Sequence, residues 1–344
     1  EEQPDLRRGQ PLKRKNGGLN ENFAREVLEL HTLGVDGGYQ QQDVTEVARA
    51  LSGWTVHYRE ADNPRLSELI EPGARLGYVR QGDFLFRADW HDAEPKTILG
   101  HSLEAGGGIE EGEKVLRLLA SHPSTARFIA TKLAQRFVSD EPGPQLVEQM
   151  AAEFRQHQGQ IRPVILAMLQ SPEFWAEAKN PRKVKSPFEF FVSCVRISGA
   201  QLQLDPSHFY WLTRMGQPLY ACGPPTGYSE DSRNWVSSSA LLQRLNFATQ
   251  LAEGRIRGLT VDWKALGEMG SEPVEALSTA LLPERNLDRE ALLSKKLSRP
   301  GDGYPPTRAW FKPSKPPDLE ERRHQILVTR VIGVLIGSPE FQYR

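Results

Sequence analysis

The sequence has few cysteines, no long apolar run and almost no net charge, and each shortage excludes a class of protein. Only Cys194 and Cys222 occur among 344 residues, and their spacing gives no disulfide framework. No stretch approaches the roughly 18 apolar residues that a membrane-spanning helix requires, so no transmembrane segment is predicted. The 43 basic and 44 acidic residues nearly cancel, which argues against a nucleic-acid partner.

Motifs for familiar cofactor and catalytic chemistry are also missing. The run GGIEEGEK at residues 107–114 resembles a phosphate loop, but Glu113 interrupts the Gly-Lys-Ser/Thr ending that phosphate binding needs. Residues 100–104 lack the final glycine of a nucleophile elbow because Glu104 occupies that position. No HExxH, paired CxxC or calcium-loop pattern occurs, so the sequence predicts no metal motif and leaves any cofactor unassigned.

Repeated helix-start signals predict a mainly α protein, an irregular assembly of many helices. A Ser, Asp or His side chain before Pro at the first helical position caps a following apolar run. This pattern occurs at His122-Pro123, Ser171-Pro172, Ser186-Pro187, Asp205-Pro206 and Ser338-Pro339. Helical spacing then predicts four buried stripes: Phe188, Phe191, Val192 and Val195; Val44, Val47, Ala48 and Leu51; Ile161, Val164, Ile165 and Met168; and Leu241, Leu242, Leu245 and Ala248.

Residues 54–100 interrupt the helical pattern. Residues 54–58, 84–90 and 97–99 carry β-branched and aromatic side chains at strand lengths, separated by Pro and Gly. We therefore predict a small antiparallel hairpin or sheet, inserted into a single helical domain over residues 1–344. Six prolines between residues 298 and 318 exclude a helix there and predict an exposed loop.

The first candidate site lies in residues 20–39, NENFAREVLELHTLGVDGGY, which predict a helix ending at Gly34 and then a tight turn. At 100° per residue His31 falls within the apolar arc of this helix, so the pattern predicts that His31 is buried. A buried imidazole needs hydrogen-bond partners, and Asp36 in the turn is one. Two alternatives follow: His31 is a core histidine that pins the helix to the turn, or a general base or metal ligand oriented by Asp36.

Polar residues at the ends of the same helix are candidate binding residues, namely Asn20, Glu21, Asn22, Arg25 and Tyr39. A second candidate pair, His91-Asp92, follows a predicted strand and precedes Lys96. Loops at strand ends often present working residues. The alternative for His91 and Asp92 is a polar turn with a local ion pair.

Several of these segments resemble the signature of a bacterial family, domain of unknown function 1800. The resemblance rests on the polar-capped helix and turn of residues 20–39, followed by Asp43-Val44, Ala48-Arg49-Ala50-Leu51 and Gly53-Trp54. Further matches are His91-Asp92 with Lys96, ARFIA at 126–130, KSPFE at 185–189 and SPEF at 338–341. The family has no established activity, so the resemblance supplies no catalytic residues.

The resemblance also implies a setting. Members usually carry an N-terminal portion before the signature, which we expect this chain to lack, and many resemble exported proteins, which implies a periplasmic or secreted location. Their genes commonly neighbour those of another uncharacterised family. We therefore expect a binding or assembly module that works with an envelope protein partner. The alternative is a metal-assisted or acid/base enzyme of the cell envelope that uses His31 and nearby carboxylates.

Overall fold

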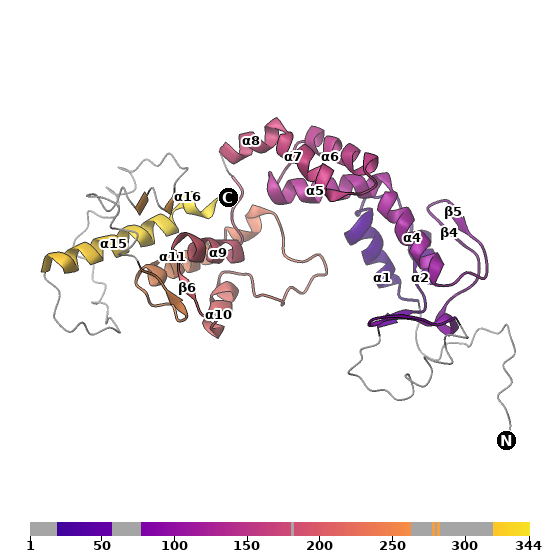
Figure 1. Ribbon diagram of the computed structural model, residues 1–344, viewed down its shortest axis with the longest axis horizontal. Helices are drawn as coiled ribbons and strands as arrows, with labels where there is room; N and C mark the ends of the chain where they lie inside the picture. The colour runs from indigo at the N-terminus through magenta and orange to yellow at the C-terminus, as the bar shows by residue number, and fades with distance from the viewer. Residues whose placement is uncertain (1–18, 57–76, 180–181, 263–276, 279–280, 283–318) are drawn as a thin grey trace, which may run out of the picture. The chain divides into compact units, whose positions relative to one another are not determined.

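The computed structural model describes residues 19–56, 77–179, 182–262, 277–278, 281–282 and 319–344 (Figure 1). The chain divides into two compact units: unit 1 comprises residues 1–134 and 142–174, and unit 2 comprises residues 135–141 and 175–344. The expectation of one helical domain stays a prediction, and the Pro-rich stretch 298–318 lies outside the described residues.

Unit 1 is built mainly from helices, as predicted. They are α1 (Glu21–Glu26), η1 (Val27–Thr32), α2 (Gln41–Ala50), η3 (Ala88–Trp90), α4 (Ile109–Ser121), α5 (Pro123–Phe137), α6 (Pro144–Gln156), α7 (Ile161–Gln170) and α8 (Pro172–Lys179). The last residues of α5 and α8 belong to unit 2. Helices α1, α2 and α4 pack around a core that includes Ala24, Leu28, Val44, Val115 and Leu119.

The β structure of unit 1 is small and antiparallel, as predicted. Strands β1 (Trp54–Val56), β3 (Phe84–Phe86) and β2 (Val79–Gln81) form one sheet in that order. Strands β4 (Lys96–Ile98) and β5 (His101–Leu103) form a separate hairpin that packs on α2. Leu99 and Gly100 between them have φ angles of 50° and 79°, as a two-residue type I′ turn requires.

The helix that carries His31 differs from a regular α-helix in one respect that matters for the site. Residues 27–32 form a π-helix, in which the Leu33 amide donates to the Leu28 carbonyl five residues earlier at 2.7 Å. Each residue therefore turns through less than 100°, and both Leu28 and Leu33 are buried. Gly34 ends this helix with φ 84°, and a Cβ atom there would lie 2.9 Å from the Phe128 ring.

Unit 2 is a second helical body with its own core. Its further elements are α9 (Pro187–Ile197), β6 (Gln201–Leu202), α10 (Pro206–Arg214), η4 (Ser232–Trp235), α11 (Ser238–Ala252), β7 (Leu259–Thr260), α15 (Leu319–Gly337) and α16 (Pro339–Gln342). Helix α11 lies along α15 (Figure 1). Strand β6 pairs antiparallel with β7. The Ser186 side chain caps α9 with a capping box, as the Ser-Pro signal predicts.

A buried arginine ties the end of the chain into unit 2. Arg244 on α11 is completely buried and donates to the Gln342 side chain at 2.8 Å and to the Lys185 carbonyl at 2.7 Å. Burial lowers the pKa of Arg244 to about 10. The guanidinium thus holds α11, the segment before α9 and the end of α16 together through hydrogen bonds.

Candidate functional site

The second candidate pair leads to a buried network of charged side chains in unit 1. Lys96 on β4 and Glu111 on α4 form an ion pair of 2.7 Å, and their side chains are 0% and 2% exposed. The Lys96 ammonium also donates to the Asp92 carbonyl and, at 2.8 Å, to the Glu94 carbonyl. All three ammonium donors are therefore used, as a fully buried lysine requires.

His91 is held between two elements of the same network. Its Nδ1 atom lies 2.9 Å from the Ser52 carbonyl, and its Nε2 atom lies 3.3 Å from a Glu111 carboxylate oxygen. The first contact is a hydrogen bond, in which Nδ1–H donates. The second contact lacks hydrogen-bond geometry, so Nε2 is buried without a hydrogen-bond partner among the described residues. The Glu111 Oε1 atom and the Trp54 indole N–H are likewise buried without a hydrogen-bond partner among the described residues.

Asp92 pairs with Arg49 on α2, and its carboxylate also lies 3.9 Å from the Lys96 ammonium. The Arg49 guanidinium donates to both Asp92 oxygens, at 2.9 and 3.1 Å, and to Glu46 at 2.8 Å. The hydrogen bonds from Arg49 lower the pKa of the Asp92 carboxyl, and a bond donated by the Glu94 amide lowers it further. The Ser52 hydroxyl accepts from the Asp92 amide at 2.8 Å and donates to the Arg49 carbonyl at 2.6 Å.

This network contains residue types that are common in active sites, but its geometry indicates a structural role. We call the buried Lys96–Glu111 pair with His91 the brace, because it connects separate elements of unit 1. His91 and Glu111 are closed to solvent, and the Asp92 carboxylate is occupied by a bidentate arginine. The charged groups join α2, the segment before β4, β4 itself and α4. Removing one partner of such a buried pair leaves an uncompensated charge, at a cost of about 3–5 kcal/mol.

The first candidate, His31, is not buried, so that prediction was wrong. Both His31 and Asp36 are exposed, and neither has a hydrogen bond or ion pair among the described residues. The reason is the π-helix: the prediction assumed 100° per residue, and the smaller rotation moves His31 out of the arc that Leu28 and Leu33 bury. Within the described ranges, no group of three or more His, Cys, Asp or Glu side chains is placed to hold a metal ion.

The candidate binding residues mostly join α1 to its neighbours. Asn20 caps α1 by accepting from the Phe23 amide at 3.1 Å. The Gln41 side chain bridges the two helices, because it donates to Glu21 at 2.9 Å and accepts from Arg25 at 2.6 Å.

The other two candidate binding residues are Tyr39 and Asn22. The Tyr39 hydroxyl donates to Glu29 at 3.1 Å, and burial together with this carboxylate raises the pKa of Tyr39. Asn22 is exposed. Whether any of the five candidates binds a ligand stays a prediction.

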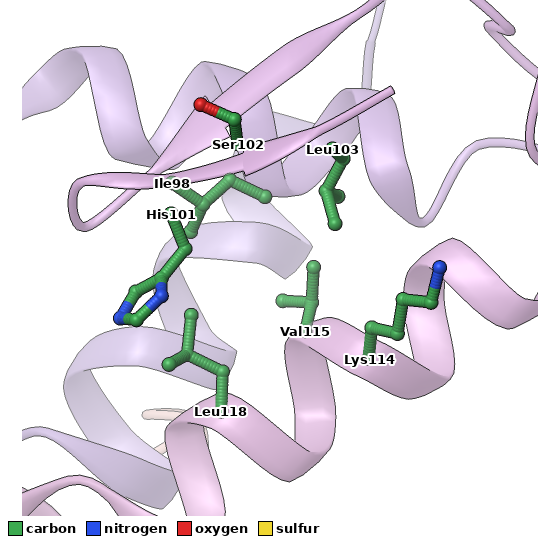
Figure 2. A pocket seen from close by; sticks show the side chains of 7 residues that line it. All are labelled: Ile98, His101, Ser102, Leu103, Lys114, Val115 and Leu118. Carbon is green, nitrogen blue, oxygen red and sulfur yellow. The ribbon is translucent and has the colours of Figure 1, made fainter. Parts of the chain in front are cut away.

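An open pocket lies beside the brace, between the β4–β5 hairpin and α4 (Figure 2). Its volume is about 230 Å³. Ile98, Leu103, Val115 and Leu118 form an apolar floor, and Figure 2 shows His101 at one end and the Lys114 ammonium at the other. Ser102 also borders the pocket, but its hydroxyl points to the opposite side of the strand.

A second, larger pocket of about 440 Å³ lies at the start of α2. Its lining is polar and includes Gln40, Gln42, Asp43 and His122. The Asp43 carboxylate accepts from the Gln40 amide at 2.8 Å and from the Leu99 amide at 2.7 Å. It therefore caps α2 and holds the β4–β5 turn at the same time. Neither pocket is lined by His31, Asp36, His91 or Asp92.

The exposed face of α11 in unit 2 is apolar, which corrects another prediction. Leu241, Leu242 and Leu245 were expected to be buried with Ala248, but they are 37%, 55% and 40% exposed. The buried stripe is instead Ala240, Arg244, Phe247, Ala248 and Leu251. Both stripes fit helical spacing, and the sequence favoured the leucines because an arginine is rarely placed in a core. Similarly, Phe188 on α9 and Ile161 on α7 are exposed, while Phe191 and Met168 are buried as predicted.

Sequence reasoning missed the partners that decide the role of His91 and Asp92. Glu111, Arg49 and Ser52 come from other elements, 15 to 43 residues away from the groups they contact. One signal was present: Glu111 lies in the first turn of α4, at helical spacing from the apolar residues Val115 and Leu119. A carboxylate on a buried helix face implies a buried cation.

The class of protein defined by these features is a mainly α-helical chain with small antiparallel sheets. No helix in the described ranges combines the length and the apolar character that crossing a bilayer requires. The chain belongs to the family described as protein of unknown function (DUF1800), whose model matches residues 4–343. No curated protein and no solved structure gave a significant match.

Proposed function

We propose that this chain is a binding or assembly module, and that the exposed face of α11 contacts a partner protein. The observation that carries the proposal is the composition of that face. Leu241, Leu242 and Leu245 are contiguous at helical spacing, and Val236, 40% exposed, precedes the Ser237 cap.

The same helix has no charged side chain at its surface. Its one charged residue, Arg244, points into the core. Surface helices normally place charged residues on their outer face, and an uncharged leucine-rich face is typical of contact with another protein. The acid/base alternative gains no comparable support, because His31 and Asp36 are exposed and not joined by a hydrogen bond.

The family resemblance favours a periplasmic or secreted location, so the partner proposed is an envelope protein. Fractionation of the producing cells, with the chain followed by antibody, tests the location separately from the interaction.

The interaction is tested with two leucine variants, one in unit 2 and one in unit 1. Leu242→Lys places a charge in the proposed interface, and Leu166→Lys does the same on α7, where Leu166 is 46% exposed. A partner is first isolated with the wild-type chain, identified, purified and titrated against each variant. We expect Leu242→Lys to weaken binding by about 30-fold, the effect of losing roughly 2 kcal/mol at an interface centre.

Leu166→Lys is expected to bind like the wild type. Equal binding by all three proteins would reject the α11 face as the interface. If the purified wild-type protein binds no partner protein and instead converts a small molecule, the proposed function itself is rejected.

A further inference from the structure

We infer that the pocket between the β4–β5 hairpin and α4 binds a small aliphatic carboxylate. This site lies in unit 1 and is independent of the α11 face. The inference rests on the pocket's shape, on its apolar floor and on Lys114 at one end (Figure 2), which has no hydrogen bond or ion pair among the described residues.

The floor of the pocket is apolar and continuous with the core of unit 1. Ile98 and Val115 are each 1% exposed and belong to the unit 1 core, and Leu103 and Leu118 pack against that core. The buried Lys96–Glu111 pair joins β4 to α4 directly beside them. The two walls are therefore held at a fixed separation, which suits a preformed ligand site.

Among the described residues that line the pocket, Lys114 is the one lysine, arginine or carboxylate side chain. Lys114 has no hydrogen bond or ion pair among the described residues, and no carboxylate lines the pocket. The glutamates that precede Lys114 on α4 are engaged elsewhere: Glu110 accepts from the Gly108 amide, Glu111 pairs with Lys96, and Glu113 pairs with Arg117. An ammonium group at the end of an apolar trough selects a ligand with an apolar body and one anionic end.

The dimensions suit a small ligand. A volume of about 230 Å³ corresponds to the space of roughly eight water molecules. A molecule of about eight non-hydrogen atoms, such as hexanoate, fills it. Its carboxylate would meet Lys114, and its chain would run over Val115 toward Leu118 and the His101 ring.

The test uses hexanoate as the probe and the methyl groups of the floor as the detector. Hexanoate is titrated into the full chain while the methyl resonances of Ile98, Leu103, Val115 and Leu118 are followed by NMR. We expect saturable shifts of these methyl groups with a dissociation constant on the order of 1 mM. Hexan-1-ol, which has the same chain without the charge, is expected to bind about fivefold more weakly.

Two variants distinguish binding of hexanoate at this pocket from non-specific binding elsewhere on the protein. Lys114→Met keeps an apolar stem without the charge and is expected to weaken hexanoate about fivefold while leaving hexan-1-ol unchanged. Lys132→Met, on α5, removes another exposed lysine and is expected to change neither.

A carboxylate at the end of a peptide has the same chemistry, so an acetylated tripeptide ending in leucine is titrated in parallel. If that peptide binds more tightly than hexanoate, the ligand of the pocket is the C-terminus of a protein and not a free aliphatic acid, and the stated ligand is wrong. Absence of methyl shifts with hexanoate, or equal affinity for hexanoate in Lys114→Met and the wild type, would overturn the site.

Discussion

At the scale of single residues, the two cations of the charged network described in unit 1, Lys96 and Arg49, each have an anion. Lys96 pairs with Glu111, and Arg49 pairs with Asp92 and Glu46. Charges removed from water cost more than their attraction returns unless hydrogen bonds satisfy the remaining positions. Here carbonyl groups of the chain accept the other Lys96 protons, which explains how a lysine is tolerated at 0% side-chain exposure.

The Arg49–Asp92 pair predicts a pH-dependent stability. The Arg49 guanidinium holds the pKa of Asp92 below its usual 3.8, so the folded state favours the ionised carboxylate. A group with a lowered folded pKa stabilises the fold above its unfolded pKa and loses that contribution as pH falls through the folded value. We expect Asp92→Asn to cost about 2 kcal/mol at pH 7. The gap between variant and wild type should close as pH falls below about 4.

Urea unfolding at pH 7, 4 and 3 measures this difference. Asp83→Asn is the matched control, because Asp83 is exposed and has no hydrogen bond or ion pair among the described residues. A gap between Asp92→Asn and the wild type that stays constant over this range would contradict the assignment.

At the scale of elements, capping signals predicted the starts of helices well, because a cap depends on two or three adjacent residues. The Ser186, Asp205 and Ser338 side chains all cap the helices that the Pro signals predicted. Helical rotation was predicted less well. The π-helix of η1 depends on the Leu28 carbonyl accepting from Leu33, and nothing in the apolar spacing distinguishes this from an α-helix.

The choice between two apolar faces depends equally on context. On α11, burial of the Arg244 stripe is settled by the Gln342 side chain and the Lys185 carbonyl, which are 98 and 59 residues away. The candidate site shows the same limit. The sequence singled out His91 and Asp92, but only the fold brings Glu111 and Arg49 to them and shows that they act as a brace.

The Asp43 carboxylate predicts a coupling between two elements. It accepts from the Gln40 amide at the start of α2 and from the Leu99 amide in the β4–β5 turn. Leu99 adopts φ 50°, which is unfavourable for a residue with a Cβ atom and needs support from its surroundings. We expect Asp43→Ala to cost about 2 kcal/mol, since it removes two hydrogen bonds to a charged acceptor.

Hydrogen exchange distinguishes this coupling from a general loss of stability. In Asp43→Ala the Leu99 amide is expected to exchange much faster, while amides in the middle of α5 follow only the global change. Glu104→Ala, which changes an exposed acid just beyond β5, should leave Leu99 protected. Unchanged protection of Leu99 in Asp43→Ala would contradict the proposed clamp.

At the scale of the whole molecule, the described chain consists of two units that each contain a core and a charged network. Unit 1 has the Lys96–Glu111 brace, and unit 2 has the buried Arg244. Units with separate cores often unfold in separate steps. We therefore expect two calorimetric transitions, each sensitive to variants in one unit only.

Two buried cations provide the matched pair for this experiment. Lys96→Met leaves the Glu111 carboxylate buried without its cation, which costs about 3–5 kcal/mol and lowers one transition by roughly 10 °C. Arg244→Met leaves the Gln342 and Lys185 oxygens without donors and is expected to lower the other transition. Lys132→Met, at the surface of α5, should shift neither. A single transition that both buried variants lower would show that the two units unfold as one, and it would favour the single helical domain that the sequence predicted.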